Sequence, residues 1–101
     1  MLLILYLWRL SNIERRMRVE YSPRFLKSAS RLSAKLLILA DSKESLFRNK
    51  PFHPSLSTHK LHGEEKGAWA FSINQKYRIK FLFLAGGTVL FLDIGTHDIY
   101  K

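Results

Sequence analysis

The chain has 101 residues, of which 47% are hydrophobic, so it is long enough for one folded domain and too apolar for a disordered segment. Seventeen Lys and Arg residues against eight Asp and Glu residues give a formal net charge of +9 with His neutral. A charge of this size predicts a polyanionic partner: nucleic acid, an anionic membrane or an acidic protein. The sequence contains no cysteine, which excludes a disulfide framework and a thiolate zinc site and is compatible with a reducing, cytoplasmic setting.

Residues 1–16 differ from the rest of the chain, and we expect them to be an N-terminal extension. The apolar run from Met1 to Trp8 is too short to span a bilayer, which takes about 20 residues. Its positive charges follow the apolar run instead of preceding it, so it does not match a secretory signal. The sequence from Met17 onward could begin a folded domain by itself. We therefore expect residues 17–101 to form the domain, with either Met1 or Met17 as the true start.

One strand and two helices are predicted first. Alternating polar and apolar residues predict a short strand over 18–21. Ser22 is a favourable N-cap and Pro23 suits the first helical position, so a helix should begin there. Ser33 is placed to cap a second helix over 34–49, whose apolar residues form a stripe that would face a core.

The second half of the chain predicts a loop and then a small sheet. Residues 50–67 have no sustained period, two prolines, two glycines and three of the four histidines, which predicts a long, functional or mobile loop. Three alternating runs predict strands joined by tight turns, over 68–74, 77–84 and 88–95. The order β-α-α-β-β-β predicts an α+β domain, with two N-terminal helices packed on one face of a small, antiparallel-dominated sheet.

The other face of this sheet should be open and positively charged. Period-two alternation places four polar residues opposite the bulky apolar residues of their strands, namely Ser72, Asn74, Arg78 and Lys80. A sheet face that carries Arg and Lys is suited to an extended anion.

Three stretches resemble the RelE/ParE superfamily of bacterial toxins, and most closely its YafQ/RelE-like mRNA interferases. They are H-x-L-x-G at 59–63, YRI at 77–79 and GTHDIY at 95–100, in this order, and the resemblance runs from Met17 to Lys101. It implies the toxin of a type II toxin–antitoxin system, a cytoplasmic, ribosome-dependent mRNA endonuclease that cleaves by acid–base chemistry with no metal and no cofactor. It also implies a cognate acidic antitoxin, mRNA in the ribosomal A site as substrate, no membrane contact, and contact with DNA only through the toxin–antitoxin complex.

Two other functions stay open beside this one. Some members of the superfamily, the ParE-like toxins, bind DNA gyrase and cleave nothing. A non-toxic RNA-binding homologue is a third possibility. The acid–base side chains discriminate between them, because a protein that only binds has no need of titrating histidines on the open face.

Metal-free RNA cleavage needs a base for the 2′-hydroxyl proton, a cation for the crowded phosphorane and an acid for the leaving oxygen. Arg78 matches the strand arginine of RelE-like nucleases and is the candidate phosphate clamp. His97 lies where relatives place a C-terminal catalytic His or Arg, and it is a candidate acid or base. His59 matches the histidine that YafQ-like members carry before L-x-G. Tyr100 would stack on a base or orient His97.

The remaining candidates are contacts to the RNA backbone: Lys60, His62, Lys66, Lys76 and Lys80. His62 is also the alternative to His59. We expect His53 and Trp69 to be structural. The H-x-x-H spacing of His59 and His62 would suit a metal only on a helix, and a loop is predicted there, so no metal site is expected.

Overall fold

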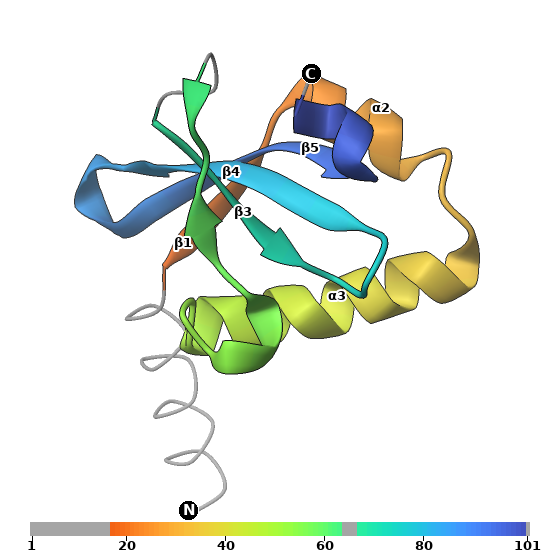
Figure 1. Ribbon diagram of the computed structural model, residues 1–101, viewed down its shortest axis with the longest axis horizontal. Coiled ribbons are helices and arrows are strands. Elements are labelled where there is room, and N and C mark those ends of the chain that lie inside the picture. Colours follow the sequence, from red (N-terminus) through yellow and green to blue (C-terminus); the bar gives the residue numbers. More distant parts are fainter. Residues whose placement is uncertain (1–16, 64–66, 101) are drawn as a thin grey trace, which may run out of the picture.

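The computed structural model describes residues 17–63 and 67–100, and Figure 1 gives the arrangement of the chain. The predicted extension over 1–16 and the candidate RNA contact Lys66 lie outside the described residues. None of the helices in the described part is long and apolar enough to cross a membrane. The elements follow in the order β1 (Arg18–Tyr21), α2 (Pro23–Ala29), α3 (Ala34–Asn49), the 3-10 turn η1 (Pro54–Leu56), β2 (His59–Lys60), β3 (Ala68–Ser72), β4 (Arg78–Leu84), η3 (Ala85–Gly87), β5 (Thr88–Gly95) and η4 (His97–Tyr100).

The fold is α+β, as predicted, with a five-stranded mixed sheet in the order β1-β5-β4-β3-β2. Strands β3, β4 and β5 form the expected antiparallel meander, while β1 pairs with β5 in parallel. The short strand β2 was not predicted. The segment 50–67 was expected to be a loop, but it contains η1 and the two-residue strand β2, which pairs with the edge of β3. Buried Leu56 and Leu61 explain this order, because each anchors the segment in an apolar cluster.

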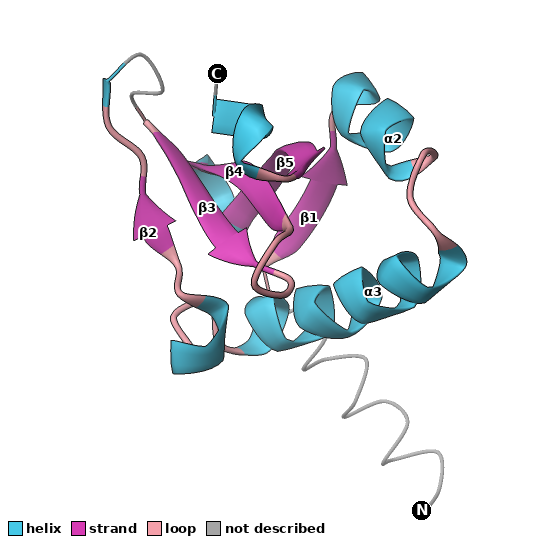
Figure 2. Cartoon of the chain, turned by 45° about the vertical axis from the view of Figure 1, so that its right-hand side comes forward, coloured by secondary structure: helices cyan, strands magenta, loops and turns pink. Residues whose placement is uncertain are grey.

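Both helices begin where their capping residues predict. The Ser22 hydroxyl accepts a hydrogen bond from the Phe25 amide at 3.0 Å, and the Ser33 hydroxyl accepts one from the Leu36 amide at 3.2 Å. These bonds satisfy amide groups that have no partner within the helix. The caps therefore set the two helix starts, and the 16-residue α3 runs under the sheet in Figures 1 and 2.

The main core lies between the two helices and one face of the sheet. Phe47 of α3 is fully buried and stacks on Phe71 of β3, with 4.3 Å between the ring centroids. Phe25 of α2 packs on Phe91 of β5 at 5.4 Å, and Phe91 also contacts Phe47. Both helices thus cover the same face, as expected, and burying each such ring contributes about 2–3 kcal/mol.

A bulge in β5 keeps this face apolar. The register runs from Phe81 opposite Phe91 to Lys80 opposite Asp93, so Leu92 is an extra residue on β5. Without it, strict alternation would turn either Phe91 or Ile94 away from the core. With it, both are buried under the helices.

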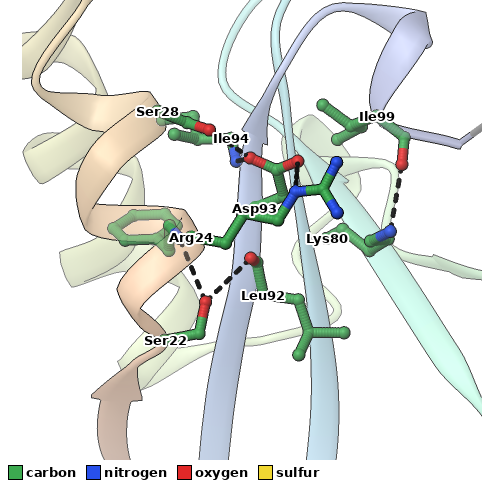
Figure 3. A network of polar contacts seen from close by, with 9 residues as sticks. Ser22, Arg24, Ser28, Lys80, Leu92, Asp93, Ile94 and Ile99 are labelled. Atoms are coloured by element: carbon green, nitrogen blue, oxygen red, sulfur yellow. Dashed lines mark hydrogen bonds and ion pairs between the residues drawn. The ribbon is translucent and has the colours of Figure 1, made fainter.

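Asp93 joins β5 to α2 through a polar network that Figure 3 shows. It is 5% exposed, and its Oδ1 accepts hydrogen bonds from the Ser28 hydroxyl at 2.6 Å and the Ile94 amide at 2.9 Å. Its Oδ2 lies 3.3 Å from Nε of Arg24. The Ser22 hydroxyl donates to the Leu92 carbonyl beside it at 2.9 Å. A buried carboxylate needs such partners, and here they fix α2 against the bulged strand.

The second sheet face, expected to be open, is partly covered by η4. In Figures 1 and 2, η4 lies on the other side of the sheet from α3. Tyr100 packs against a small apolar cluster of Leu61, Ala68 and Ala70. A Cβ atom at Gly95 would lie 2.7 Å from Cγ2 of Ile99, so the absence of a side chain at Gly95 allows η4 to fold back. This is the physical reason for a glycine at the end of β5.

Candidate functional site

The strand register places three candidate residues on the face that η4 covers. Ser72 is paired with Arg78, and Arg78 with Gly95. In the next row His59 is paired with Ala70, and Ala70 with Lys80. Directly paired residues lie on the same side of a sheet, so Arg78, Lys80 and His59 share this face. Lys60 is paired with Trp69, which packs against the core under the helices. Lys60 therefore belongs to the helix-covered face of the sheet, opposite to the face of His59.

Arg78 is held at the first position of β4 by backbone carbonyls. Its Nη1 donates hydrogen bonds to the carbonyl oxygens of Asn74 at 2.9 Å and Tyr77 at 3.3 Å. The turn that supplies these carbonyls is itself ordered, because Oδ1 of Asn74 accepts from the amides of Lys76 and Tyr77. Since both bonds use one nitrogen of a group with five N–H donors, the charge is fixed in place with donors left for an anion.

Tyr100 brings a phenol next to this guanidinium. Its hydroxyl is buried and has no hydrogen-bond partner among the described residues. Burial raises the pKa of Tyr100 above its ordinary value, and the charge and N–H donors of nearby Arg78 oppose that rise. The Arg78 guanidinium thus lies close to the hydroxyl, while its Nη1 donates to the carbonyls of Asn74 and Tyr77. At neutral pH the phenol keeps its proton and can donate it.

His97 is brought to the same place by the short helix η4. It is exposed, and its ring meets the ring of Tyr100 edge-on, with 5.4 Å between centroids and 79° between planes. Side chains three residues apart on a 3-10 helix lie one above the other, which explains this contact. His97, Tyr100 and Arg78 therefore form one group, which we call the Arg78 group.

His59 lies on the same face at some distance from the Arg78 group. It is two strands away from β4, which corresponds to roughly 10 Å across the sheet. Its Nδ1 lies 2.8 Å from the carbonyl oxygen of Ser57, which can only accept, so Nδ1 carries the proton. In the neutral ring Nε2 is then the basic nitrogen. His62 is also exposed, beyond the end of β2.

The other candidates have different surroundings. The ammonium group of Lys80 donates to the carbonyl of Ile99 at 3.0 Å, which ties η4 to the sheet (Figure 3). Lys76 is exposed in the β3–β4 turn. His53 caps η1, since its Nδ1 accepts from the Ser55 amide at 3.1 Å. Among the residues that the structure describes, no three metal-ligating side chains gather at one place.

The sequence did not indicate the supporting roles of two residues at the site. Asn74 positions Arg78, and Ser57 orients His59. The role of Asn74 could have been recognised, because an Asn side chain in a turn commonly accepts a hydrogen bond from the backbone amide two residues later. Ser57 carries no such signal. It has a φ of 49°, in the left-handed region that non-glycine residues rarely adopt and that is enriched at functional sites.

The fold of the chain is similar to the folds of known proteins. No protein-family model matches the chain, and no curated protein matches it in sequence. Several solved structures are similar to it. YafQ from E. coli strain BL21(DE3) has a TM-score of 0.69 at 18% identity, over 82% of this chain and 96% of that chain. A YoeB/ParE toxin from Agrobacterium tumefaciens has a TM-score of 0.67 at 15% identity, over 80% of this chain and 99% of that chain.

A RelE–RelB complex from the archaeon Pyrococcus horikoshii OT3 is similar with a TM-score of 0.64 at 13% identity, over 79% of this chain and 93% of that chain. YafQ is also similar in a DinJ–YafQ toxin–antitoxin complex, with a TM-score of 0.66 at 18% identity, over 82% of this chain and 94% of that chain. The resemblance that the sequence motifs predict is therefore confirmed at the level of structure: the chain has the fold of the RelE/ParE superfamily of toxins.

Proposed function

We propose that the protein is the toxin of a type II toxin–antitoxin system and acts as a ribosome-dependent mRNA endonuclease. The observation that carries the proposal is the Arg78 group, in which a fixed guanidinium, a phenol with a buried hydroxyl and an exposed imidazole meet on one face of the sheet. A site that only bound a protein partner would gain nothing from a desolvated hydroxyl without a hydrogen bond, which costs about 1–3 kcal/mol in stability.

The chemistry would proceed by attack of an RNA 2′-hydroxyl on the adjacent phosphorus. The 2′-hydroxyl loses its proton to a base, the bond from phosphorus to the 5′ oxygen breaks, and an acid protonates that oxygen. Arg78 would neutralise the charge that builds up on the phosphorane oxygens. Tyr100 would donate to the same oxygens or stack on a base. The fixed tautomer of His59 favours it as the base, which leaves His97 as the acid.

The proposal includes the partners and the extent of the toxin. The net charge of +9 suits both an RNA backbone and an acidic antitoxin. Solved neighbours of this fold include toxin–antitoxin complexes, and we propose a cognate antitoxin for this chain too. The toxin would act in the cytoplasm, where the ribosome is, and residues 17–101 would form its domain with 1–16 as an extension. Lys76, His62 and Lys66 would contact the RNA backbone.

Induced expression in cells, followed by primer extension on a translated message, tests the proposal. Wild type should cut within codons, whereas His97→Ala and Arg78→Ala should leave the message intact. Arg31→Ala is the control, because it removes one exposed positive charge between α2 and α3, away from the site. Growth arrest by all four proteins with intact message would contradict the nuclease and support a ParE-like toxin that binds gyrase.

A further inference from the structure

A polar hollow lies beside Arg78 at one end of the sheet. At this end the β3–β4 turn approaches α3, as the ribbons of Figures 1 and 2 show. It has a volume of about 380 Å³, within the range of small-molecule sites. Its lining comes from three parts of the chain: Lys43 from α3, Ser55 and Ser57 from the η1 segment, and Ser72, Asn74 and Arg78 from the β3–β4 hairpin. Neither the Arg78 group nor the resemblance assigns a role to Lys43, Ser55 or Ser57.

The lining is rich in hydrogen-bond donors and carries positive charge. Lys43 and Arg78 each supply a cation, and the described residues around the hollow include no carboxylate. Oδ1 of Asn74 is occupied by the amides of Lys76 and Tyr77, so its side chain has only its amide N–H groups left to offer. Such a lining stabilises an anion and discriminates against a neutral or cationic ligand.

The hollow adjoins the proposed cleavage site through shared residues. Arg78 belongs both to the hollow and to the Arg78 group. Ser57 lines the hollow, and its carbonyl orients His59. A strand of RNA whose phosphate meets Arg78 on the sheet face would therefore pass its next nucleotide directly into the hollow.

We infer that this hollow binds the nucleotide that flanks the cleaved phosphate, with the flanking phosphate between Lys43 and Arg78. The inference rests on the proposed function, because it takes RNA as the substrate. Lys43, Ser55 and Ser57 then extend the substrate track from the sheet face to α3. A volume of about 380 Å³ accommodates a nucleotide, whereas a lone phosphate would leave most of it empty.

Binding of a 2′-O-methylated RNA trinucleotide to the full chain tests this inference, because the probe lacks the attacking hydroxyl and cannot be cut. Amide NMR signals of residues 55–57 and 72–75 should shift on titration. Lys43→Ala should weaken binding about fivefold and lower the slope of log Kd against log salt by about 0.7, the value for one lost phosphate contact on a single strand. Lys35→Ala, which removes the same charge from an exposed position of the same helix, should change the affinity less than twofold.

The two outcomes separate this inference from the proposed function. Shifts in the hollow that depend on Lys43 would support it even in a protein that cleaves no message. Equal weakening by Lys43→Ala and Lys35→Ala, or unshifted hollow amides at the highest probe concentration, would overturn it even if the ribosome-dependent cleavage assay succeeds.

Discussion

Replacing Tyr100 by Phe should stabilise the protein and impair cleavage at the same time. The Tyr100 hydroxyl is buried without a hydrogen-bond partner among the described residues. Leaving such a group unsatisfied costs about 1–3 kcal/mol, and the lower end applies here because the nearby Arg78 charge compensates in part. Tyr100→Phe should therefore raise the free energy of unfolding by about 1 kcal/mol. For a domain of this size that corresponds to a rise in Tm of about 4 °C.

Tyr21→Phe is the matched control, because it removes a hydroxyl that the fold uses. The Tyr21 hydroxyl donates to the Glu44 carboxylate at 2.9 Å and accepts from Nη2 of Arg48 at 3.2 Å. These bonds join β1 to α3, so their loss should lower the free energy of unfolding by about 1 kcal/mol. The same chemical change should thus have opposite signs at the two positions.

Urea unfolding monitored by circular dichroism measures both variants. Primer extension on the same proteins should show at least about a tenfold loss of cleavage for Tyr100→Phe, the lower range for losing a proton donor, and none for Tyr21→Phe. If Tyr100→Phe lowered stability as much as Tyr21→Phe, the hydroxyl would have a structural partner, and the reasoning that assigns it to the substrate would be refuted.

Three further predictions concern the fold around the site. Gly95→Ala should displace η4, because the new Cβ would lie 2.7 Å from Cγ2 of Ile99. Hydrogen exchange of the η4 amides should then increase and RNA cleavage should fall about tenfold. Unchanged hydrogen exchange would contradict this prediction. Asp93→Ala should lower the free energy of unfolding by about 2–3 kcal/mol, since it removes a buried acceptor from the Ser28 hydroxyl and the Ile94 amide. A loss below about 0.5 kcal/mol in urea titration would oppose it. Burial raises the pKa of Tyr21 and of Tyr100, so the folded state binds more protons than the unfolded state above about pH 10. The free energy of unfolding should therefore fall as pH rises from about 10 to 11. An increase of the free energy of unfolding over this range would contradict the prediction.

The helix starts and the central strands were predictable because their signals are local. Ser22 and Ser33 cap their helices through amides only three residues away. Alternation within β3 and β4 already separates the residues under the helices from those on the other face. These preferences depend on neighbours within a few positions, so they survive in any tertiary context that keeps the elements.

The candidate site was predictable only in part. Its residue types at Arg78, His97, His59 and Tyr100 came from chemistry and resemblance, and their roles stay predictions. The sequence did not indicate that the Tyr100 hydroxyl is buried close to Arg78, because this contact joins positions that are distant along the chain. It also did not indicate that His59 and Lys60 face opposite sides of the sheet, because the sequence predicts a loop there.

The sequence by itself thus determined the order of the two helices and the four longer strands, the two caps, the apolar face of the sheet and the strong positive charge. Tertiary structure alone decided the parallel pairing of β1 with β5, the bulge at Leu92 and the return of η4 over the sheet. The physical reason is range. Helix caps and alternation depend on interactions between residues a few positions apart. Strand register and the close approach of two segments depend on tertiary packing, such as the space that Gly95 leaves for Ile99.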